Sequence, residues 1–250
     1  MSGHNKACLC LPVAVVDDYQ AKGRYETVLD TKTYITGPSD ASRALLLIYD
    51  AFGYSPQLLQ GADILAASLN ALVVVPDFFK GKVASESWFP PDTEEKKAAI
   101  GDWFATAGNF AVHIEPMKEL VQQLSTQYPS VSGKWGAFGY CWGGKMVALT
   151  SGEGTIFKTS GQTHPGMLSA DDVSKINIPH IILASKDEDA TAVAECKKVL
   201  EGPGKTGLVK SYPDQIHGWM AARANLKDET VRKAFEDGYK TAAEFFEQHL

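Results

Sequence analysis

The stretch Lys134-Trp-Gly-Ala-Phe-Gly-Tyr-Cys-Trp-Gly-Gly144 decides the fold, because it joins a short apolar strand to a helix through a glycine-rich turn. We predict a strand over residues 134–138 and a helix that follows Cys141. Gly139 and Gly143 stand two positions on either side of that cysteine. A sharp strand-to-helix turn strains its central residue and leaves no room for side chains at these two positions. The sequence therefore places Cys141 at the tip of a strand-turn-helix unit.

Strands and helices alternate on both sides of this unit. Continuous apolar runs are typical of strands buried on both faces of a parallel sheet. Such runs cover residues 44–49, 72–75 and 179–184, and residues 207–212 form the last predicted strand. Helical spacing or cap signals cover 55–70, 109–127, 141–152, 190–200 and 229–249, and a segment of mixed charge at 93–104 receives no element. The alternation predicts an α/β fold with a mostly parallel twisted sheet and helices on both faces. We expect residues 1–250 to form one domain, with the first 30 wrapping the surface.

Composition excludes several classes of protein. The chain has 250 residues, 44% of them hydrophobic and 22% charged, with a net charge of −6. This acidic balance argues against a nucleic-acid partner, which requires clustered Lys and Arg. No segment approaches the roughly 20 apolar residues of a membrane span. With four cysteines and no secretion signal, we expect reduced thiols and a cytoplasmic location.

Signals for a metal or a cofactor are weak. Cys8, Cys10 and His4 lack the usual two-to-four-residue spacer and the further ligands of a zinc site. Glycine-rich stretches do not match a phosphate loop. We predict neither a metal nor an organic cofactor, and nothing in the sequence indicates the oligomeric state.

Cys141 is the strongest candidate for a chemical role. It occupies the serine position of a G-x-S-x-G turn, in which a nucleophile is exposed between a strand and a helix. The positive end of the following helix favours the thiolate form. The alternative is a buried structural cysteine in a tight turn.

A nucleophile in this position requires an acid and a histidine that follow later strands. Asp187 comes directly after the strand at 179–184, and His217 after the strand at 207–212. We assign His217 to proton transfer and Asp187 to orienting its ring. The alternative role for Asp187 is to cap the helix predicted over residues 190–200, and Asp189 competes with it for that role. His164, which also follows a strand, is the rival of His217.

These residues resemble the dienelactone hydrolases, a family with the α/β-hydrolase fold and a Cys, His and Asp triad. The resemblance covers nearly the whole chain, and cysteines before Pro12-Val13 followed by Lys22-Gly23 are similar to the fungal branch. The matching motifs are Tyr49-Asp-Ala-Phe-Gly53, Pro76-Asp-Phe-Phe-Lys-Gly81, Gly139-Tyr-Cys-Trp-Gly-Gly144, His164-Pro-Gly166, Asp187 and His217-Gly218.

The resemblance implies further roles near Cys141. The backbone amides of Ala51 and Trp142 would form the oxyanion hole, in which each donor contributes about 3 kcal/mol. Asp50 stands at the position of a family glutamate that acts on the nucleophile, and its side chain is one methylene shorter.

The substrate is expected to carry little negative charge. Family members that bind an anionic lactone hold its carboxylate with arginines, yet no arginine occurs between residues 78 and 131. Arg223 could supply one contact. Aromatic residues expected to line the pocket are Trp88, Phe89, Trp142 and Trp219.

The leading hypothesis is a hydrolase that cleaves a small ester or lactone through an acyl-enzyme on Cys141. A non-catalytic binding module on the same fold and a thiol sensor of oxidants are the alternatives.

Overall fold

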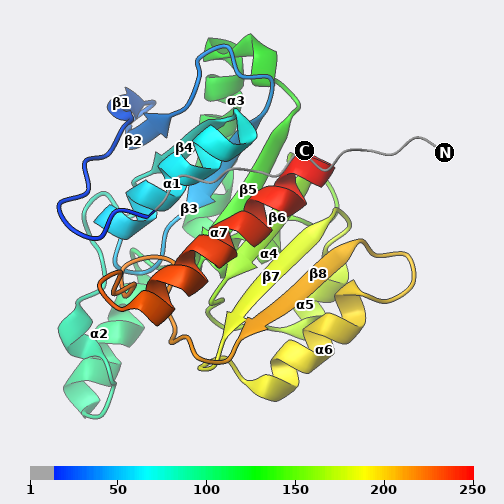
Figure 1. The fold of residues 1–250 in the computed structure, drawn as a ribbon. Coiled ribbons are helices and arrows are strands. Elements are labelled where there is room, and N and C mark those ends of the chain that lie inside the picture. The colour runs from blue at the N-terminus through cyan, green and yellow to red at the C-terminus, as the bar shows by residue number, and fades with distance from the viewer. Residues whose placement is uncertain (1–13) are drawn as a thin grey trace.

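One eight-stranded sheet forms the centre of the molecule (Figure 1). The computed structural model describes residues 14–250, so His4, Cys8 and Cys10 lie outside the described residues. The strands are β1 (Arg24–Val28), β2 (Thr31–Thr36), β3 (Ala44–Ile48), β4 (Leu72–Pro76), β5 (Trp135–Tyr140), β6 (Thr159–Thr163), β7 (His180–Ser185) and β8 (Gly207–Tyr212). Their order in the sheet is β1-β2-β4-β3-β5-β6-β7-β8. Strands β3 to β8 are parallel to their neighbours among themselves, which confirms the predicted α/β class.

Helices cover both faces of this sheet (Figure 1). They are α1 (Pro56–Leu69), α2 (Glu94–Ala105), α3 (Ala111–Gln127), α4 (Trp142–Thr150), α5 (Ala170–Lys175), α6 (Ala190–Leu200) and α7 (Glu229–His249), with short 3₁₀ turns at Glu86–Trp88 and Pro129–Val131. Helices α1 and α7 pack together, while α5 contacts both α4 and α6. Within the described part of the chain, no helix combines the length and the apolar character that crossing a membrane requires.

Helix α1 is capped at both ends, and its start agrees with the sequence prediction. The Ser55 hydroxyl accepts a hydrogen bond from the Leu58 amide at 3.2 Å, and proline occupies the first helical position. At the other end Asn70 adopts a left-handed conformation with φ of 47°. Both features satisfy backbone groups that a helix end leaves without partners.

Five elements received no predicted bounds, because pairing or capping forms them without a long apolar pattern. Strands β1 and β2 form an antiparallel edge, in which Ile35 pairs with Val74 of β4. Strand β6 is polar but wholly buried, and His180 of β7 bonds to its Ser160 and Gln162 side chains at 2.7 and 3.0 Å. The segment of mixed charge forms α2, which buries only Trp103. The short helix α5 buries only Val173.

The parallel sheet determines where chemistry is possible. Because parallel strands point the same way, the turns after β3, β5, β6, β7 and β8 meet at one edge of the sheet. Asp50 follows β3, Cys141 follows β5 and His164 follows β6. All candidate site residues of the triad and oxyanion hole belong to these turns or to the loops that continue from them.

Candidate active site

Cys141 sits in a strained turn between β5 and α4. Its φ is 49° and its ψ is −108°, a conformation that non-glycine residues rarely adopt. A Cβ on Gly143 would lie 1.9 Å from the Ile48 carbonyl oxygen, and one on Gly139 would lie 2.1 Å from the Gly143 oxygen. Both contacts are with backbone, which cannot move aside. The close packing of the turn against β3 therefore requires both glycines, as the sequence predicted.

Backbone hydrogen bonds hold the Cys141 turn on both sides. The Cys141 amide donates to the Thr163 carbonyl at 3.2 Å, and the Cys141 carbonyl accepts from the Gly144 and Gly166 amides at 3.0 Å each. The residue is half-buried. A fixed and partly accessible cysteine is the arrangement that a nucleophile needs.

His217 lies between the Cys141 sulfur and a carboxylate. Its Nδ1 is 2.7 Å from Glu188 Oε1, and the Cys141 side chain is close enough to the ring to raise its pKa. Burial alone would lower the pKa of His217, but the interactions with Cys141 and Glu188 outweigh burial and raise that pKa to about 10. The imidazole is therefore protonated at neutral pH. A protonated imidazole beside the sulfur favours a thiolate.

The acid on the His217 ring is Glu188, which corrects the prediction of Asp187. Asp187 Oδ2 instead accepts the backbone amide of His217 at 2.7 Å. Asp189 caps α6, where its Oδ1 accepts from the Ala192 amide at 2.8 Å. Three consecutive acids thus perform three different tasks. The glutamate reaches the ring because its side chain is longer, whereas the shorter aspartate contacts the nearer backbone.

Glu188 is held in place before it meets the histidine. Its side chain is 3% exposed and accepts hydrogen bonds from the amide and, at 3.1 Å, from the hydroxyl of Ser185. The Lys186 amide donates to the Gln215 carbonyl at 3.0 Å, which ties this turn to the His217 loop. Sequence reasoning missed Glu188 because a run of acids carries no pattern that separates a ring contact from a backbone contact. The path of the backbone after β7 determines which acid reaches the His217 ring.

His164, the rival histidine, is not placed to act as the base. Its ring is fully buried and lies edge-on to that of His217, with 5.2 Å between centroids. Among the described residues its Nε2 has no hydrogen-bond partner. Burial, followed by the charges of His217 and Arg223, holds the pKa of His164 well below its usual value. His164 is therefore a neutral neighbour of His217.

Asp50 connects two loops of the site. Its Oδ1 accepts the Phe52 amide at 2.8 Å, and its Oδ2 accepts the Ala222 amide at 3.4 Å. Burial raises the pKa of Asp50 to about 6, against the opposing effect of these amides and of the His217 and Arg223 charges. Within residues 14–250 it makes no hydrogen bond to Cys141. Its contacts fix the loop after β3 against the loop that follows His217.

Two backbone amides near Cys141 are without acceptors. The amides of Ala51 and Trp142 donate to no group within residues 14–250. The Gly143 amide donates to the Tyr49 carbonyl at 3.2 Å, which brings the turns after β3 and β5 together. Unpaired amides on adjacent strand ends are suited to bind a negative oxygen.

The predicted pocket residues differ in position. Trp219 is fully buried, with its ring 4.3 Å from that of Tyr212, and its predicted place in the pocket is wrong. Its large apolar ring packs in the core instead. The Trp142 ring is buried as well, and its Nε1 donates to the Gly108 carbonyl at 2.8 Å. Trp88 lines a hollow of about 390 Å³ beside α2.

Phe89 and Arg223 lie beside the turn after β3. The Phe89 ring packs edge-on against Phe52, with 5.8 Å between centroids. The Arg223 guanidinium carbon lies 5.3 Å from the centroid of Phe52 and 5.9 Å from that of Phe89. Arg223 is exposed and forms no ion pair within the described range. These residues remain predicted substrate contacts.

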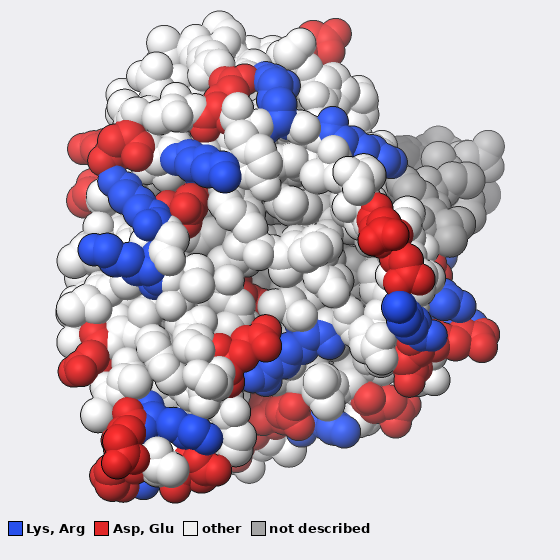
Figure 2. Space-filling view, turned by 90° about the vertical axis from the view of Figure 1, so that its left-hand side faces the viewer, with Lys and Arg blue, Asp and Glu red and all other residues white. Residues whose placement is uncertain are grey.

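The charged surface does not resemble a nucleic-acid interface on the face shown in Figure 2. There, Lys and Arg side chains are interspersed with Asp and Glu around a largely uncharged centre. No group of three or more His, Cys, Asp and Glu residues within residues 14–250 is arranged to hold a metal ion.

Comparisons with known proteins identify the family to which the chain is similar. A family model described as the dienelactone hydrolase family matches residues 31–250. An AIM2 family protein of Schizosaccharomyces pombe is 32% identical over 92% of both chains, and a human carboxymethylenebutenolidase homolog is 24% identical over 81% of both. A putative dienelactone hydrolase from Klebsiella pneumoniae superimposes with a TM-score of 0.70 at 16% identity, covering 91% of this chain and 98% of that one.

Proposed function

The chain belongs to the dienelactone hydrolase family and is a hydrolase of the ester or lactone type, and on that premise we propose that Cys141 is its nucleophile, with His217 and Glu188. The observation that carries the proposal is the position of His217. Its Nδ1 is 2.7 Å from a carboxylate oxygen of Glu188, and the Cys141 side chain is close enough to the ring to raise its pKa. This is the relation of nucleophile, base and orienting acid that acyl transfer requires.

Acylation follows from the charge states at the site. The thiolate of Cys141 attacks the carbonyl carbon of the substrate, a carbon–sulfur bond forms, and the carbonyl electrons move onto oxygen. The amides of Ala51 and Trp142 donate to this oxyanion. When the intermediate collapses, the His217 imidazolium gives its proton to the departing alkoxide, which leaves as an alcohol. A thioester on Cys141 and a neutral imidazole remain.

Deacylation restores the starting state. Neutral His217 takes a proton from water, and the resulting hydroxide attacks the thioester carbonyl. The same two amides hold the second oxyanion, which expels the Cys141 thiolate and releases a carboxylic acid. Glu188 keeps Nδ1 of the ring hydrogen-bonded throughout, so Nε2 is the atom that exchanges the proton. No cofactor enters either step.

Asp50 serves this reaction as a positioning residue. Its carboxyl group joins the turn that carries Ala51 to the loop that follows His217. The proposal thus retains an auxiliary role for Asp50, although the role is to fix two loops rather than to contact the sulfur.

The preferred substrate is an ester or lactone with an apolar or aromatic group. The Phe52 and Phe89 rings offer an apolar surface beside the Asp50 turn, and Arg223 offers one cation. A single guanidinium suits a substrate with at most one acid group. Human and bacterial relatives named for butenolide or dienelactone hydrolysis are consistent with a small cyclic ester.

Steady-state hydrolysis of p-nitrophenyl acetate by the native protein and by Cys141→Ala tests the proposal. We expect the variant to lose at least about 10⁴-fold in kcat, as for removal of a triad nucleophile. Unchanged hydrolysis by the variant would exclude Cys141 as the nucleophile. If both proteins are inactive toward a panel of aryl esters and lactones, the binding-module alternative is favoured.

The redox-sensor alternative is tested with peroxide. A sensor would form a stable sulfenic acid or disulfide on Cys141 at low peroxide while showing no ester turnover. The hydrolase proposal expects turnover, with peroxide acting only as an inactivator.

A further inference from the structure

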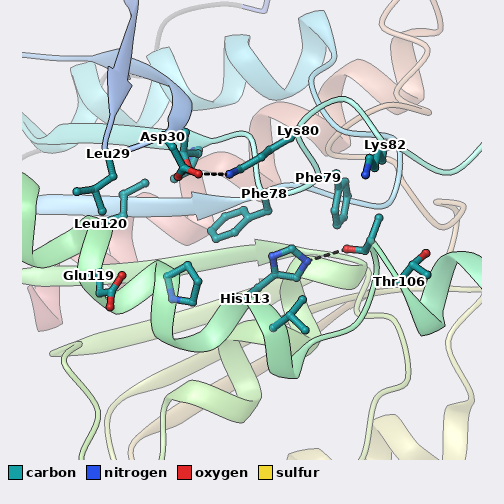
Figure 3. Close-up of a pocket in the computed structure, with 15 residues that line it drawn as sticks. Leu29, Asp30, Phe78, Phe79, Lys80, Lys82, Thr106, His113, Glu119 and Leu120 are labelled. Carbon is teal, nitrogen blue, oxygen red and sulfur yellow. Dashed lines mark hydrogen bonds and ion pairs between the residues drawn. The ribbon is translucent and has the colours of Figure 1, made fainter.

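A second hollow is lined by side chains that pack against the Trp142 ring. It has a volume of about 900 Å³, within the usual range for small-molecule pockets, and it opens between the β1–β2 turn and α3 (Figure 3). Its apolar lining includes Phe78, Phe79 and Leu120. Figure 3 shows the two phenylalanine rings above His113, across the hollow from α3. None of the proposed triad residues lines it.

The hollow is connected to the site through the Trp142 ring. The centroid of this ring lies 4.7 Å from that of Phe79, 6.1 Å from Phe78 and 5.3 Å from His113. The backbone amide of the same tryptophan is one proposed oxyanion donor. A ligand in the hollow would therefore press on the three rings that hold the position of this donor.

His113 offers a hydrogen-bond acceptor to the hollow. Its Nε2 is 2.7 Å from the Ala107 carbonyl, an acceptor, so Nε2 carries the proton. Burial lowers the pKa of His113, against the effect of that carbonyl, and the ring is neutral at pH 7. Nδ1 is then an acceptor without a partner among the described residues. A ligand hydroxyl group would complement it.

Charges at the rim define the rest of the ligand. Lys80 is paired with Asp30 at 2.5 Å, whereas Lys82 forms no ion pair within residues 14–250. Glu119, also without an ion pair in that range, lies at the opposite end of the hollow from Lys82 (Figure 3). An acid group would be attracted to the Lys82 end and repelled from the other.

We propose that this hollow binds a small hydroxylated aromatic carboxylate, with its ring against Phe78 and Phe79, its hydroxyl on His113 and its acid group toward Lys82, and that the bound acid alters the rate at Cys141. The effect on rate depends on the proposed function, but the binding does not.

Calorimetric titration with 4-hydroxyphenylacetate tests the binding. The protein is used with Cys141 already alkylated by iodoacetamide, so that binding in the catalytic site is blocked. We expect saturable binding that is about fivefold to tenfold weaker for phenylacetate, which lacks the hydroxyl, and for 4-hydroxyphenylacetamide, which lacks the charge. No saturable binding, or binding only before alkylation, would overturn the proposal.

Matched variants locate the ligand. Lys82→Met should weaken binding about tenfold, whereas Lys80→Met, which removes a paired lysine of the same rim, should change it less than twofold. Val112→Trp should abolish binding, since it fills the hollow from an exposed position of α3. Equal effects of the two lysine variants, or full binding by the tryptophan variant, would contradict this placement.

Hydrolysis of p-nitrophenyl acetate in the presence of the same acid tests the effect on rate. We expect a saturable change in kcat of at least twofold that disappears in Val112→Trp. Saturable calorimetric binding with an unchanged kcat would overturn the effector role. If the protein hydrolyses no ester at all, the proposed function fails, while the calorimetric result still decides whether the hollow binds its ligand.

Discussion

The turn around Cys141 and the turn that carries Glu188 are both short loops after buried strands, yet they are determined by different forces. At Cys141 the backbone decides, because two glycines pass within van der Waals distance of backbone carbonyls. After β7 the side chains determine the contacts, because Asp187 binds the His217 backbone amide and Glu188 binds the His217 ring. The first turn requires glycine at two positions, whereas in the second turn two similar acids make different contacts.

The largest expected effect separates the two acids. Glu188→Gln should lower kcat/KM by on the order of 10³ to 10⁴, because the ring loses the carboxylate that orients it and stabilises its charge. Asp187→Asn keeps an oxygen for the His217 amide and should cost less than about tenfold. Ester hydrolysis by both variants measures the difference. Equal losses, or a larger loss for Asp187→Asn, would return the role of the acid to Asp187.

The Cys141 turn should fail in a different way, through stability. Gly143→Ala places a methyl group 1.9 Å from the Ile48 carbonyl oxygen, and we expect a loss of about 4 kcal/mol or more in the free energy of unfolding. Gly154→Ala is the matched control for added side-chain volume, since its Cβ would contact nothing within 4 Å, although its φ of 74° adds strain. Urea denaturation compares the two, and equal stabilities would show that the turn is less tightly packed than its geometry indicates.

The rate at which Cys141 is alkylated measures the charge pair between the His217 imidazolium and the Cys141 thiolate. The interactions with Cys141 and Glu188 outweigh burial and raise the pKa of His217 to about 10, so the imidazolium persists at pH 6 and is lost only as pH rises through that value. At pH 6 iodoacetamide should therefore modify the native protein about tenfold to hundredfold faster than His217→Ala, in which no imidazolium stabilises the thiolate.

Cys196 is the internal control for this reaction. It is fully buried, and burial, with the charges of Glu195 and Asp172, raises its pKa to about 11. It should remain unmodified in both proteins. Equal alkylation rates at Cys141 with and without His217 would contradict the charge pair.

The smallest expected effect concerns Asp50, which joins the two sides of the site. Because burial raises its pKa from 3.8 to about 6, the charged carboxylate costs stability above that value and costs nothing below pH 3.8. Asp50→Asn should therefore raise the free energy of unfolding by about 1 to 2 kcal/mol at pH 8 and leave it unchanged near pH 3.5. Its kcat should also fall if the loops shift. A loss of stability at pH 8 would show that the weak Ala222 contact outweighs burial of the charge.

The same contrast explains how much could be predicted from sequence. Buried strands such as β3 and β7, the turn at Cys141 and the position of His217 follow from apolar runs and glycine spacing, which reflect backbone constraints. The edge strands β1 and β2 have no such run and form through pairing with β4. Glu188 lay beside the predicted acid, and Trp219 was assigned to the pocket although it packs in the core. In both cases the outcome depends on where a side chain points, which residue type and spacing do not encode.

Rapid-quench mass spectrometry of the native protein with p-nitrophenyl acetate shows directly whether Cys141 carries the acyl group. Samples quenched during the burst are digested, and the acetyl group is located by peptide mapping. We expect acetylation of Cys141, in amounts that match the burst of p-nitrophenolate and decay at the steady-state rate. Acetylation at another residue with that kinetic behaviour, or a full burst without a thioester on Cys141, would contradict the role of Cys141 as the nucleophile.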